Sequence, residues 1–268
     1  MKHQIIQAQV LYISHGGGPL PLLGDPSHTA MIEFMRGLPA SLHRPEAILV
    51  ISAHWEEHAP TALASPKPPM LYDYYGFPPE AYVFSYPAPG NPALAQEIAT
   101  LLGEAGIPAH LDAQRGFDHG SFIPLSLMYG DADIPMIQLS LIRGLDAKQH
   151  LSLGRALSSL LEENILIIGS GFSFHNMQAF SFAGGRRQDD KNDAFQDWLI
   201  KVSTGKYSQQ EREDQLLHWA QAPFARYCHP REEHLLPLLV CLSLAGGPAK
   251  VVFDEYILGK RSLALQWY

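Results

Sequence analysis

The alternation of short apolar runs with helical patterns is the feature that most restricts the folds open to this chain. Four compact apolar runs, bounded by polar residues, glycine or proline, predict buried β-strands at residues 9–13, 47–53, 136–141 and 165–169. Helices are predicted at residues 27–36, 91–102, 146–163, 190–202 and 230–245, and two late strands at 251–257 and 262–266. This order indicates an α/β fold.

The composition favours one globular enzyme-sized domain. The 268 residues are 46% hydrophobic and 17% charged, enough for a sizeable core, and neither a repeat nor a Gly/Ser linker divides residues 1–268. The formal charge of -8 comes without any basic run, so we expect no nucleic-acid partner.

The cysteine content and the hydropathy pattern suggest a compartment. Cys228 and Cys241 are too few for a disulfide framework and lack the spacing of a thiolate zinc site, so we expect two reduced thiols in a cytoplasmic protein. No stretch approaches the ~20 apolar residues of a membrane span, and we expect neither a membrane segment nor a signal peptide.

Histidines follow three of the predicted strands. His15 comes directly after the first strand, His54 after the second, and His175 shortly after the strand at 165–169. Because ligands of open α/β sheets sit at the carboxyl ends of strands, we expect these imidazoles to share a site. Neutral imidazole binds zinc and ferrous iron well, so a metal site is the simplest interpretation.

Two further histidines are candidates for the same site. His119 lies in a turn-like stretch beside Asp118 and Ser121, which could orient its ring. His234 is expected in the first turn of the predicted helix at 230–245. The other histidines are expected in polar surroundings or on helix surfaces: His3, His28, His43, His58, His110, His150, His218 and His229.

Two local motifs suggest other hydrolytic chemistry. The run HWEEH at 54–58 has the spacing of inverted zinc proteases, but it follows a strand and ends at Pro60, so the required helix is not expected. The run HGGG at 15–18 resembles an esterase oxyanion loop, with Ser173 placed like a nucleophile. A nucleophile elbow needs glycine two residues after the serine, where this chain has His175.

The proline-rich segment (residues 60–92) interleaves prolines with aromatic residues and predicts a long ordered loop. Two interpretations remain open: a surface excursion held down by its aromatic rings, or a wall over a pocket for a flat or apolar ligand.

Six motifs occur in order along the chain: SHGG at 14–17, SAHW at 52–55, GFDHGS at 116–121, DADIPM at 131–136, GSG at 169–171 with HN at 175–176, and EHLLPL at 233–238. Together they resemble the motifs of the extradiol ring-cleavage dioxygenases of the LigB superfamily, and of their DOPA 4,5-dioxygenase-like branch in particular. The resemblance implies a single three-layer α/β/α domain with a central mixed sheet and helices on both faces.

The resemblance also implies site residues. The metal ligands would be His15, His54 and His234, with His175 as a fourth ligand or as the acid/base, and His119 beside them. Relatives that cleave protocatechuate use a glutamate ligand, which leaves a choice between Glu233 and His234, and we favour His234.

The implied reaction inserts O2 into a catechol, DOPA-like or related, to give a ring-opened semialdehyde. His175 would be the principal acid/base, since an imidazole exchanges protons near neutral pH. His119 would be a second catalytic residue that positions the substrate or assists proton transfer. Fe(II) is expected in the working enzyme and Zn(II) in the isolated protein, because zinc often outcompetes iron. Two alternatives stay open: a zinc-dependent hydrolase at the same histidines, or a non-catalytic binding relative.

Two sets of residues are candidates for contacting the substrate, whereas the oligomeric state is left open. An aromatic pocket could be lined by Trp55, Phe77, Tyr86, Phe117 and Phe122. A cation for an acidic substrate could come from Arg115, Arg143, Arg186, Arg187 or Arg231.

Overall fold

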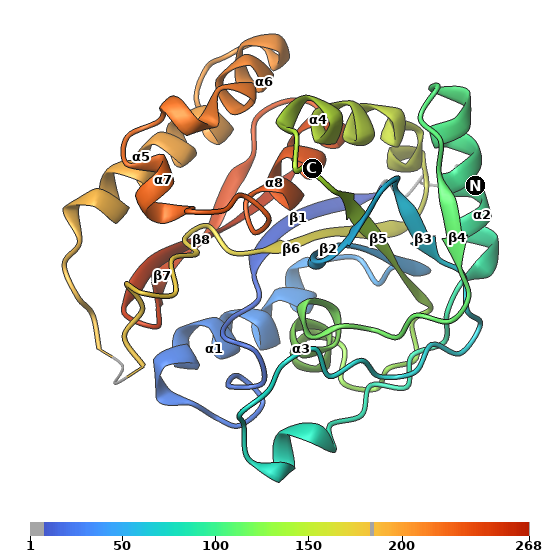
Figure 1. Ribbon diagram of the computed structural model, residues 1–268, viewed down its shortest axis with the longest axis horizontal. Helices are drawn as coiled ribbons and strands as arrows, with labels where there is room; N and C mark the ends of the chain where they lie inside the picture. The colour runs from blue at the N-terminus through green and yellow to red at the C-terminus, as the bar shows by residue number, and fades with distance from the viewer. Residues whose placement is uncertain (1–7, 183–184, 268) are drawn as a thin grey trace.

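One mixed β-sheet of eight strands runs through the molecule in the order β4-β3-β5-β2-β6-β1-β8-β7 (Figure 1). The computed structural model describes residues 8–182 and 185–267. The strands are β1 (Gln9–Ser14), β2 (Ala47–Glu57), β3 (Thr61–Leu63), β4 (His110–Asp112), β5 (Met136–Ile142), β6 (Ile165–Gly171), β7 (Lys250–Ile257) and β8 (Lys260–Trp267). The inner strands β5, β2, β6 and β1 are parallel, whereas β8 pairs antiparallel with β1 and β7, and β3 antiparallel with β5.

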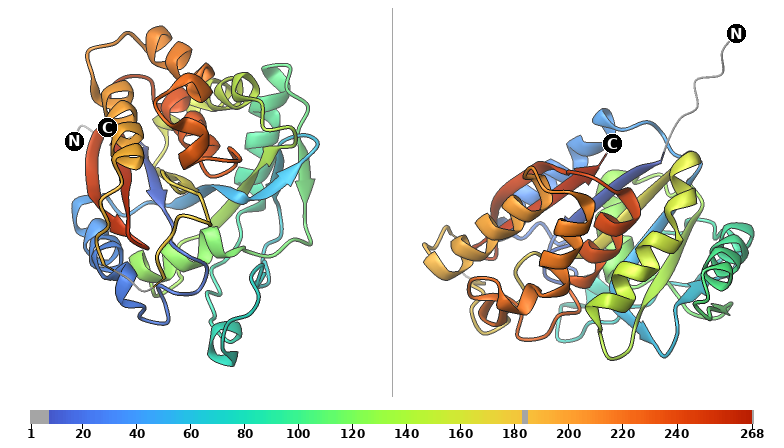
Figure 2. Two further views of the ribbon diagram at one scale, coloured as in Figure 1. Left: turned by 60° about the vertical axis from the view of Figure 1, so that its left-hand side comes forward. Right: turned by 90° about the horizontal axis from the view of Figure 1, so that it is seen from above.

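Helices cover both faces of this sheet (Figures 1 and 2). The described helices are α1 (Thr29–Gly37), α2 (Pro92–Glu104), α3 (His119–Met128), α4 (Ala147–Ala156), α5 (Asp190–Thr204), α6 (Gln209–Leu217), α7 (Ala225–Cys228) and α8 (Leu236–Ala245). One face carries α1 and α3, and the other carries α2, α4, α8 and the α5–α7 group. Within the described ranges, no helix has the length and apolar character needed to cross a membrane.

The inner strands are apolar on both faces because both faces are covered. In β1, Val10 and Tyr12 pack on the α8 side, whereas Leu11 and Ile13 pack on the α1 and α3 side. This is why the sequence shows continuous apolar runs rather than alternation. The expected α/β fold, with three layers and a central mixed sheet, is confirmed.

Two predicted helices are shorter than expected. The helix predicted at 230–245 begins only at Leu236, since Pro237 is tolerated in a first helical turn but not further in. His234 therefore precedes the helix instead of lying in its first turn. The helix predicted at 146–163 ends at Ala156 and continues as a separate 3-10 turn, Ser158–Glu162.

Several short elements were not predicted, and α3 is the most important of them. Its first residues read as a turn because Gly120 and Pro124 are both poor helix formers, yet the helix runs from His119 to Met128. Tertiary packing overrides the local preference here, since every α3 residue except Ser126 is buried. The strands β3 and β4 and the helices α6 and α7 were also missed.

The expectation of surface histidines was wrong for three residues. His28, His150 and His229 are fully buried, whereas four others are exposed and His3 lies outside the described residues. Burial is possible because both ring nitrogens of His28 and His150, and Nε2 of His229, are hydrogen-bonded. For example, His150 Nε2 accepts the Ile142 N–H at 3.1 Å, and its Nδ1 donates to the Asp146 carbonyl at 2.8 Å.

His229 should make the fold sensitive to acid. Burial lowers the pKa of His229 to about 3, far below the ~6.5 of an exposed imidazole. At pH values between these two, the unfolded chain binds a proton that the folded chain excludes, so stability falls as pH falls. We expect the free energy of unfolding to lose about 1.4 kcal/mol per pH unit from this residue well below pH 6.5.

The test is urea unfolding between pH 7 and pH 4.5, with His229→Gln as the comparison. Glutamine retains a donor for the Ser173 carbonyl, which His229 Nε2 contacts at 2.9 Å, but it does not titrate. The free energy of unfolding of the variant should fall less steeply with decreasing pH, by about 1.4 kcal/mol per pH unit well below pH 6.5. Identical pH slopes for the two proteins would contradict this account.

Candidate active site

Three adjacent parallel strands deliver histidines to one edge of the sheet. His15 directly follows β1, His54 lies near the end of β2, and β6 leads to His175. Because β6 pairs with both β1 and β2, these three side chains start from neighbouring positions. His119, the first residue of α3, and His234, just before α8, complete the group. The predicted site residues are thus brought together.

An irregularity in β2 directs His54 into the site. The register of β2 with β5 jumps from the pair Ile51 and Leu139 to the pair Glu56 and Leu141. Residues 52–55 therefore lie opposite a single residue of β5. Bulges of this kind bend a strand and re-aim its side chains, and they are frequent beside active sites.

The rings of His15, His54 and His234 form a nearly equilateral triangle. Their centroids are 4.8, 5.2 and 4.9 Å apart. The Nε2 atoms of His15 and His54 are 3.0 Å apart. Nitrogen ligands at about 2.1 Å from a common ion and about 90° apart would be separated by about 3.0 Å, so this pair of donors fits a divalent metal. Donor atoms of His119 also lie within 4.8 Å of those of His15 and His54, and His175, Glu233 and His234 form a second such group.

The Nδ1 atom of His15 has a partner that determines its tautomer. It lies 2.9 Å from Ser170 Oγ, and the Ser170 hydroxyl donates to the Gly120 carbonyl. Ser170 Oγ must therefore accept a hydrogen bond from His15 Nδ1–H. The proton is then on Nδ1, and Nε2 has a free lone pair. The Gly120 carbonyl is available because Pro124, four residues on in α3, has no N–H to donate to it.

Glu233 orients two rings at once. Its Oε1 lies 2.9 Å from His234 Nδ1 and 3.2 Å from His175 Nδ1. The His175 ring stacks on the His234 ring at 3.4 Å. Protonation at Nδ1 leaves the Nε2 atom of each ring free to act as a ligand or a base. The Tyr12 hydroxyl also donates to the His234 carbonyl at 2.9 Å and fixes the backbone here.

Asp73 is a site residue that the sequence analysis missed. Its Oδ1 accepts from the backbone N–H of His119 at 3.0 Å and from His119 Nδ1 at 2.8 Å. Asp73 belongs to the proline-rich segment and is far from His119 in sequence, so no spacing pattern connects them. Part of this segment therefore contributes to the site, as the pocket-wall interpretation expects.

Three imidazoles of the site, those of His15, His54 and His234, are held neutral. Burial, together with the neighbouring imidazoles, holds the pKa values of His15 and His54 well below the usual range. Burial also lowers the pKa of His234 to about 3. Burial opposes ionisation of Glu233, but hydrogen bonds from His175 and His234 hold its pKa well below the usual range. Neutral imidazole is the form that binds metals.

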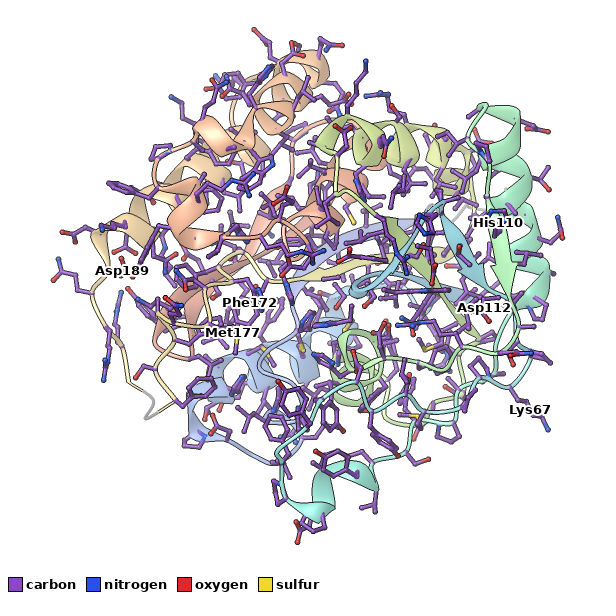
Figure 3. All side chains as sticks on the ribbon, in the orientation of Figure 1. Lys67, His110, Asp112, Phe172, Met177 and Asp189 are labelled. Carbon is purple, nitrogen blue, oxygen red and sulfur yellow. The ribbon has the colours of Figure 1, made fainter. Side chains whose placement is uncertain are left out.

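The histidines form the base of a cavity of about 380 Å³. Of the five aromatic residues expected to line a pocket, only Phe77 does so. Trp55, Tyr86, Phe117 and Phe122 are buried in the core instead. The apolar wall comes from Tyr74, Tyr75, Phe77, Phe172, Met177, Phe180, Phe182 and Leu258. Figure 3 shows Phe172 and Met177 on the segment after β6, well apart from the exposed His110 of β4.

The two hydrolase motifs do not form hydrolase sites. The run from His54 to His58 lies on and just beyond an extended strand, and the His58 ring is exposed and contacts Arg143. Ser173 is fully buried, and its Oγ accepts the Leu263 N–H at 2.8 Å. Neither residue is presented to a substrate.

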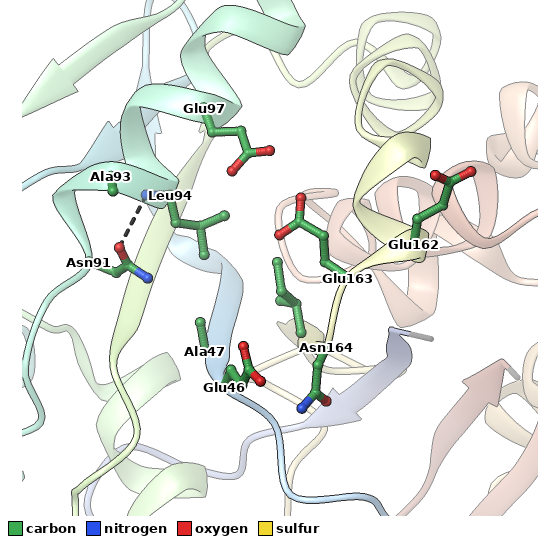
Figure 4. A pocket seen from close by; sticks show the side chains of 10 residues that line it. Glu46, Ala47, Asn91, Ala93, Leu94, Glu97, Glu162, Glu163 and Asn164 are labelled. Atoms are coloured by element: carbon green, nitrogen blue, oxygen red, sulfur yellow. Dashed lines mark hydrogen bonds between the residues drawn. The ribbon is translucent and has the colours of Figure 1, made fainter. Parts of the chain in front are cut away.

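A larger hollow, of about 630 Å³, lies at the other end of the strands and lacks this chemistry. Figure 4 shows carboxylates around it, with Glu97 and Glu163 facing one another. Burial and the proximity of Glu97 raise the pKa of Glu163. No imidazole lines this hollow within the described part of the chain, so the smaller cavity is the candidate active site.

Known proteins resemble this chain over most of its length. The family described as the catalytic LigB subunit of aromatic ring-opening dioxygenase matches residues 24–262. "Dioxygenase tasH" of Hapsidospora irregularis is 41% identical, covering 93% of this chain and 82% of the relative. The "4,5-DOPA dioxygenase extradiol" of Escherichia coli (strain K12) is 36% identical, covering 94% and 92%.

A solved structure agrees with these sequence relatives. It is that of an uncharacterized protein from Escherichia coli K12, 31% identical, with a TM-score of 0.79 and coverage of 97% of this chain and 99% of the other. Dioxygenases of the family depend on a metal, and the histidine cluster found here could bind one. The chain belongs to the LigB family of aromatic ring-opening dioxygenases, and it is an extradiol dioxygenase.

Proposed function

We propose that the enzyme cleaves a catechol-type ring beside its two hydroxyls, using Fe(II) held by His15, His54 and His234. The observation that carries this proposal is the triangle of three neutral imidazoles at the base of an apolar cavity. We further propose that residues 1–268 act as one catalytic domain.

The partners of the Nδ1 atoms support this ligand set. Ser170 leaves the Nε2 atom of His15 free to bind a metal, and Glu233 does the same for His234. Glu233 Oε1 already accepts from two imidazole N–H groups, which favours His234 over Glu233 as the ligand. When bound, ferrous iron supplies Lewis acidity and a route for electrons between the catechol and dioxygen.

His175 is proposed as the acid/base. Its Nδ1 faces Glu233, so Nε2 is the atom that accepts a proton from a catechol hydroxyl, and the carboxylate stabilises the resulting imidazolium. The ring-opened product contains all the atoms of the catechol and of O2. The proton that His175 removes must therefore return before the product leaves. His175 acts first as a general base and then as a general acid.

His119 is proposed to position the substrate. Asp73 holds both its backbone N–H and its ring, and the ring centroid lies 3.8 Å from that of His54. Its ring is therefore restrained beside the proposed ligands, with Nε2 as the free ring nitrogen. Zn(II) would fit the same imidazoles, and we expect it in the isolated protein.

Reconstitution with a defined metal tests the activity. Protein stripped of metal and reloaded anaerobically with Fe(II) should consume oxygen and form a yellow ring-opened product with a panel of catechols that includes DOPA. The zinc-loaded sample should consume no oxygen, because Zn(II) does not change oxidation state. The measurement is oxygen uptake together with the product absorbance.

Other outcomes would favour the alternatives. Hydrolysis of esters or amides by the zinc-loaded protein without oxygen would indicate a hydrolase. Metal binding at full iron occupancy with no turnover of any catechol would indicate a non-catalytic relative.

His175→Ala should separate proton transfer from metal binding. We expect turnover to fall by about 10²- to 10⁴-fold, the usual contribution of a general acid/base, with little loss of metal. His15→Ala and His54→Ala should lower both metal content and turnover. Exposed His218 offers a matched control, and His218→Ala should change neither. Normal turnover by His175→Ala would refute the assignment.

Ser170→Ala tests the orientation of His15. Without the Oγ acceptor, His15 Nδ1 loses its partner, and we expect metal affinity to fall by about 10- to 100-fold. Affinity is measured by competition with a chelator. Ser126→Ala is the control, because the Ser126 hydroxyl donates only within α3, to the Phe122 carbonyl. Equal affinities of the two variants would show that Ser170 does not orient a ligand.

A further inference from the structure

The mouth of the cavity exposes large apolar side chains from two separate segments. Tyr75, from the proline-rich segment, is 91% exposed, and Met177 and Phe182, from the segment after β6, are 59% and 57% exposed. All three line the cavity. Apolar groups gathered at the entrance of a pocket are typical of a surface that an apolar ligand covers.

The described wall of the cavity contains no lysine or arginine. The two arginines behind the site are already engaged. Arg115 donates to Asp118 and to the His54 carbonyl, both at 3.2 Å. Arg231 lies 2.7 Å from Glu56 and 3.3 Å from Glu233.

None of the other candidate cations lines the cavity. Arg186 stacks over the Tyr256 ring at 4.5 Å, and Lys260 pairs with Asp189. Arg143 contacts His58, which lies beyond the end of β2, and Arg187 is exposed. A carboxylate on the substrate would therefore be desolvated among aromatic rings without a counter-ion, which is strongly unfavourable.

The central amide of the glycine loop after His15 is not available to an anionic substituent. Backbone N–H groups of such loops often bind anions, and residues 16–18 line the cavity. Here the Gly17 N–H donates to His28 Nε2 at 3.0 Å, and His28 Nδ1 is held by Asp25 at 2.9 Å. The buried His28 therefore takes the central amide of the loop away from a ligand.

The one acidic residue of the wall is also committed. Asp73 Oδ1 accepts two N–H groups of His119, and Oδ2 lies 3.8 Å from His54 Nδ1. Its negative charge repels a carboxylate. Within the described wall, a carboxylate on a ring substituent therefore finds no cation, and an ammonium group finds only Asp73, which already holds His119.

We propose that the substrate is a catechol whose ring substituent is uncharged and apolar or aromatic, covered by Tyr75, Met177 and Phe182. This inference rests on the proposed ring cleavage and adds the substrate class. The cavity of about 380 Å³ lies within the ~300 to 1,000 Å³ range of small-molecule pockets and has room for a substituent. Amino acids such as DOPA, which carry both charges, are expected to be poor substrates.

Matched substrates test the proposal. The iron-loaded enzyme is assayed with 4-propylcatechol, with 3-(3,4-dihydroxyphenyl)propionate, which replaces the terminal methyl by a carboxylate, and with dopamine and DOPA. We expect kcat/KM for 4-propylcatechol to exceed each of the other values at least about tenfold. Anaerobic titration calorimetry should likewise give 4-propylcatechol the lowest dissociation constant of the four.

The outcomes separate the two proposals. If a charged catechol is used as well as 4-propylcatechol or better, the substrate class is wrong while ring cleavage stands. If no catechol is consumed, the proposed ring cleavage is wrong. The binding affinities from calorimetry then test by themselves whether the cavity prefers an uncharged substituent. Failure of 4-propylcatechol to bind more tightly than its charged counterparts then overturns the inference.

A charge introduced at the mouth should weaken the preference for the uncharged substrate. Met177→Arg places a cation beside the substituent, so kcat/KM for the propionate should rise about fivefold or more relative to 4-propylcatechol. Val83→Arg is the matched control, because Val83 is 75% exposed but does not line the cavity. An equal change in both variants would show that position 177 does not contact the substituent.

Discussion

The parallel pairing of β6 with both β1 and β2 is the constraint on which the site depends. Each of these strands leads to a histidine at its carboxyl end, and a shared register places those ends at one edge. The pairing is supported from both faces, since the side chains of these strands are buried in two cores. Three of the imidazoles thus follow or lie on buried inner strands of the sheet, and α3 and the residues before α8 add two more.

Ser170 joins three parts of the structure at a single hydroxyl. It lies on β6, accepts from the His15 ring after β1, and donates to the Gly120 carbonyl of α3. That carbonyl is free only because Pro124 lacks an N–H. Pro124 weakens the helix locally, and it thereby leaves the Gly120 carbonyl free to accept the hydrogen bond that orients Ser170. The strand β2 contributes in a different way, by a bulge that turns His54 inward.

The apolar character of the cavity entrance follows from polar groups that are already paired. Glu233 serves two rings, Asp73 holds His119, and the nearby arginines are bound to carboxylates. His28 occupies the amide of Gly17. Pairing these groups leaves aromatic and apolar side chains as the surface that a ring substituent meets. The same polar network that orients the histidines thus also makes the entrance apolar.

The sequence by itself determined the fold class, the order of most elements and the set of histidines, because apolar periodicity and strand-end position are local properties. It did not determine α3, whose Gly120 and Pro124 read as a turn until burial stabilises the helix. It placed His28, His150 and His229 on the surface, since burial of a satisfied imidazole depends on distant partners. Asp73 as the partner of His119, and the lining of the cavity, depend on contacts between segments far apart in the chain, so only the tertiary structure decided them.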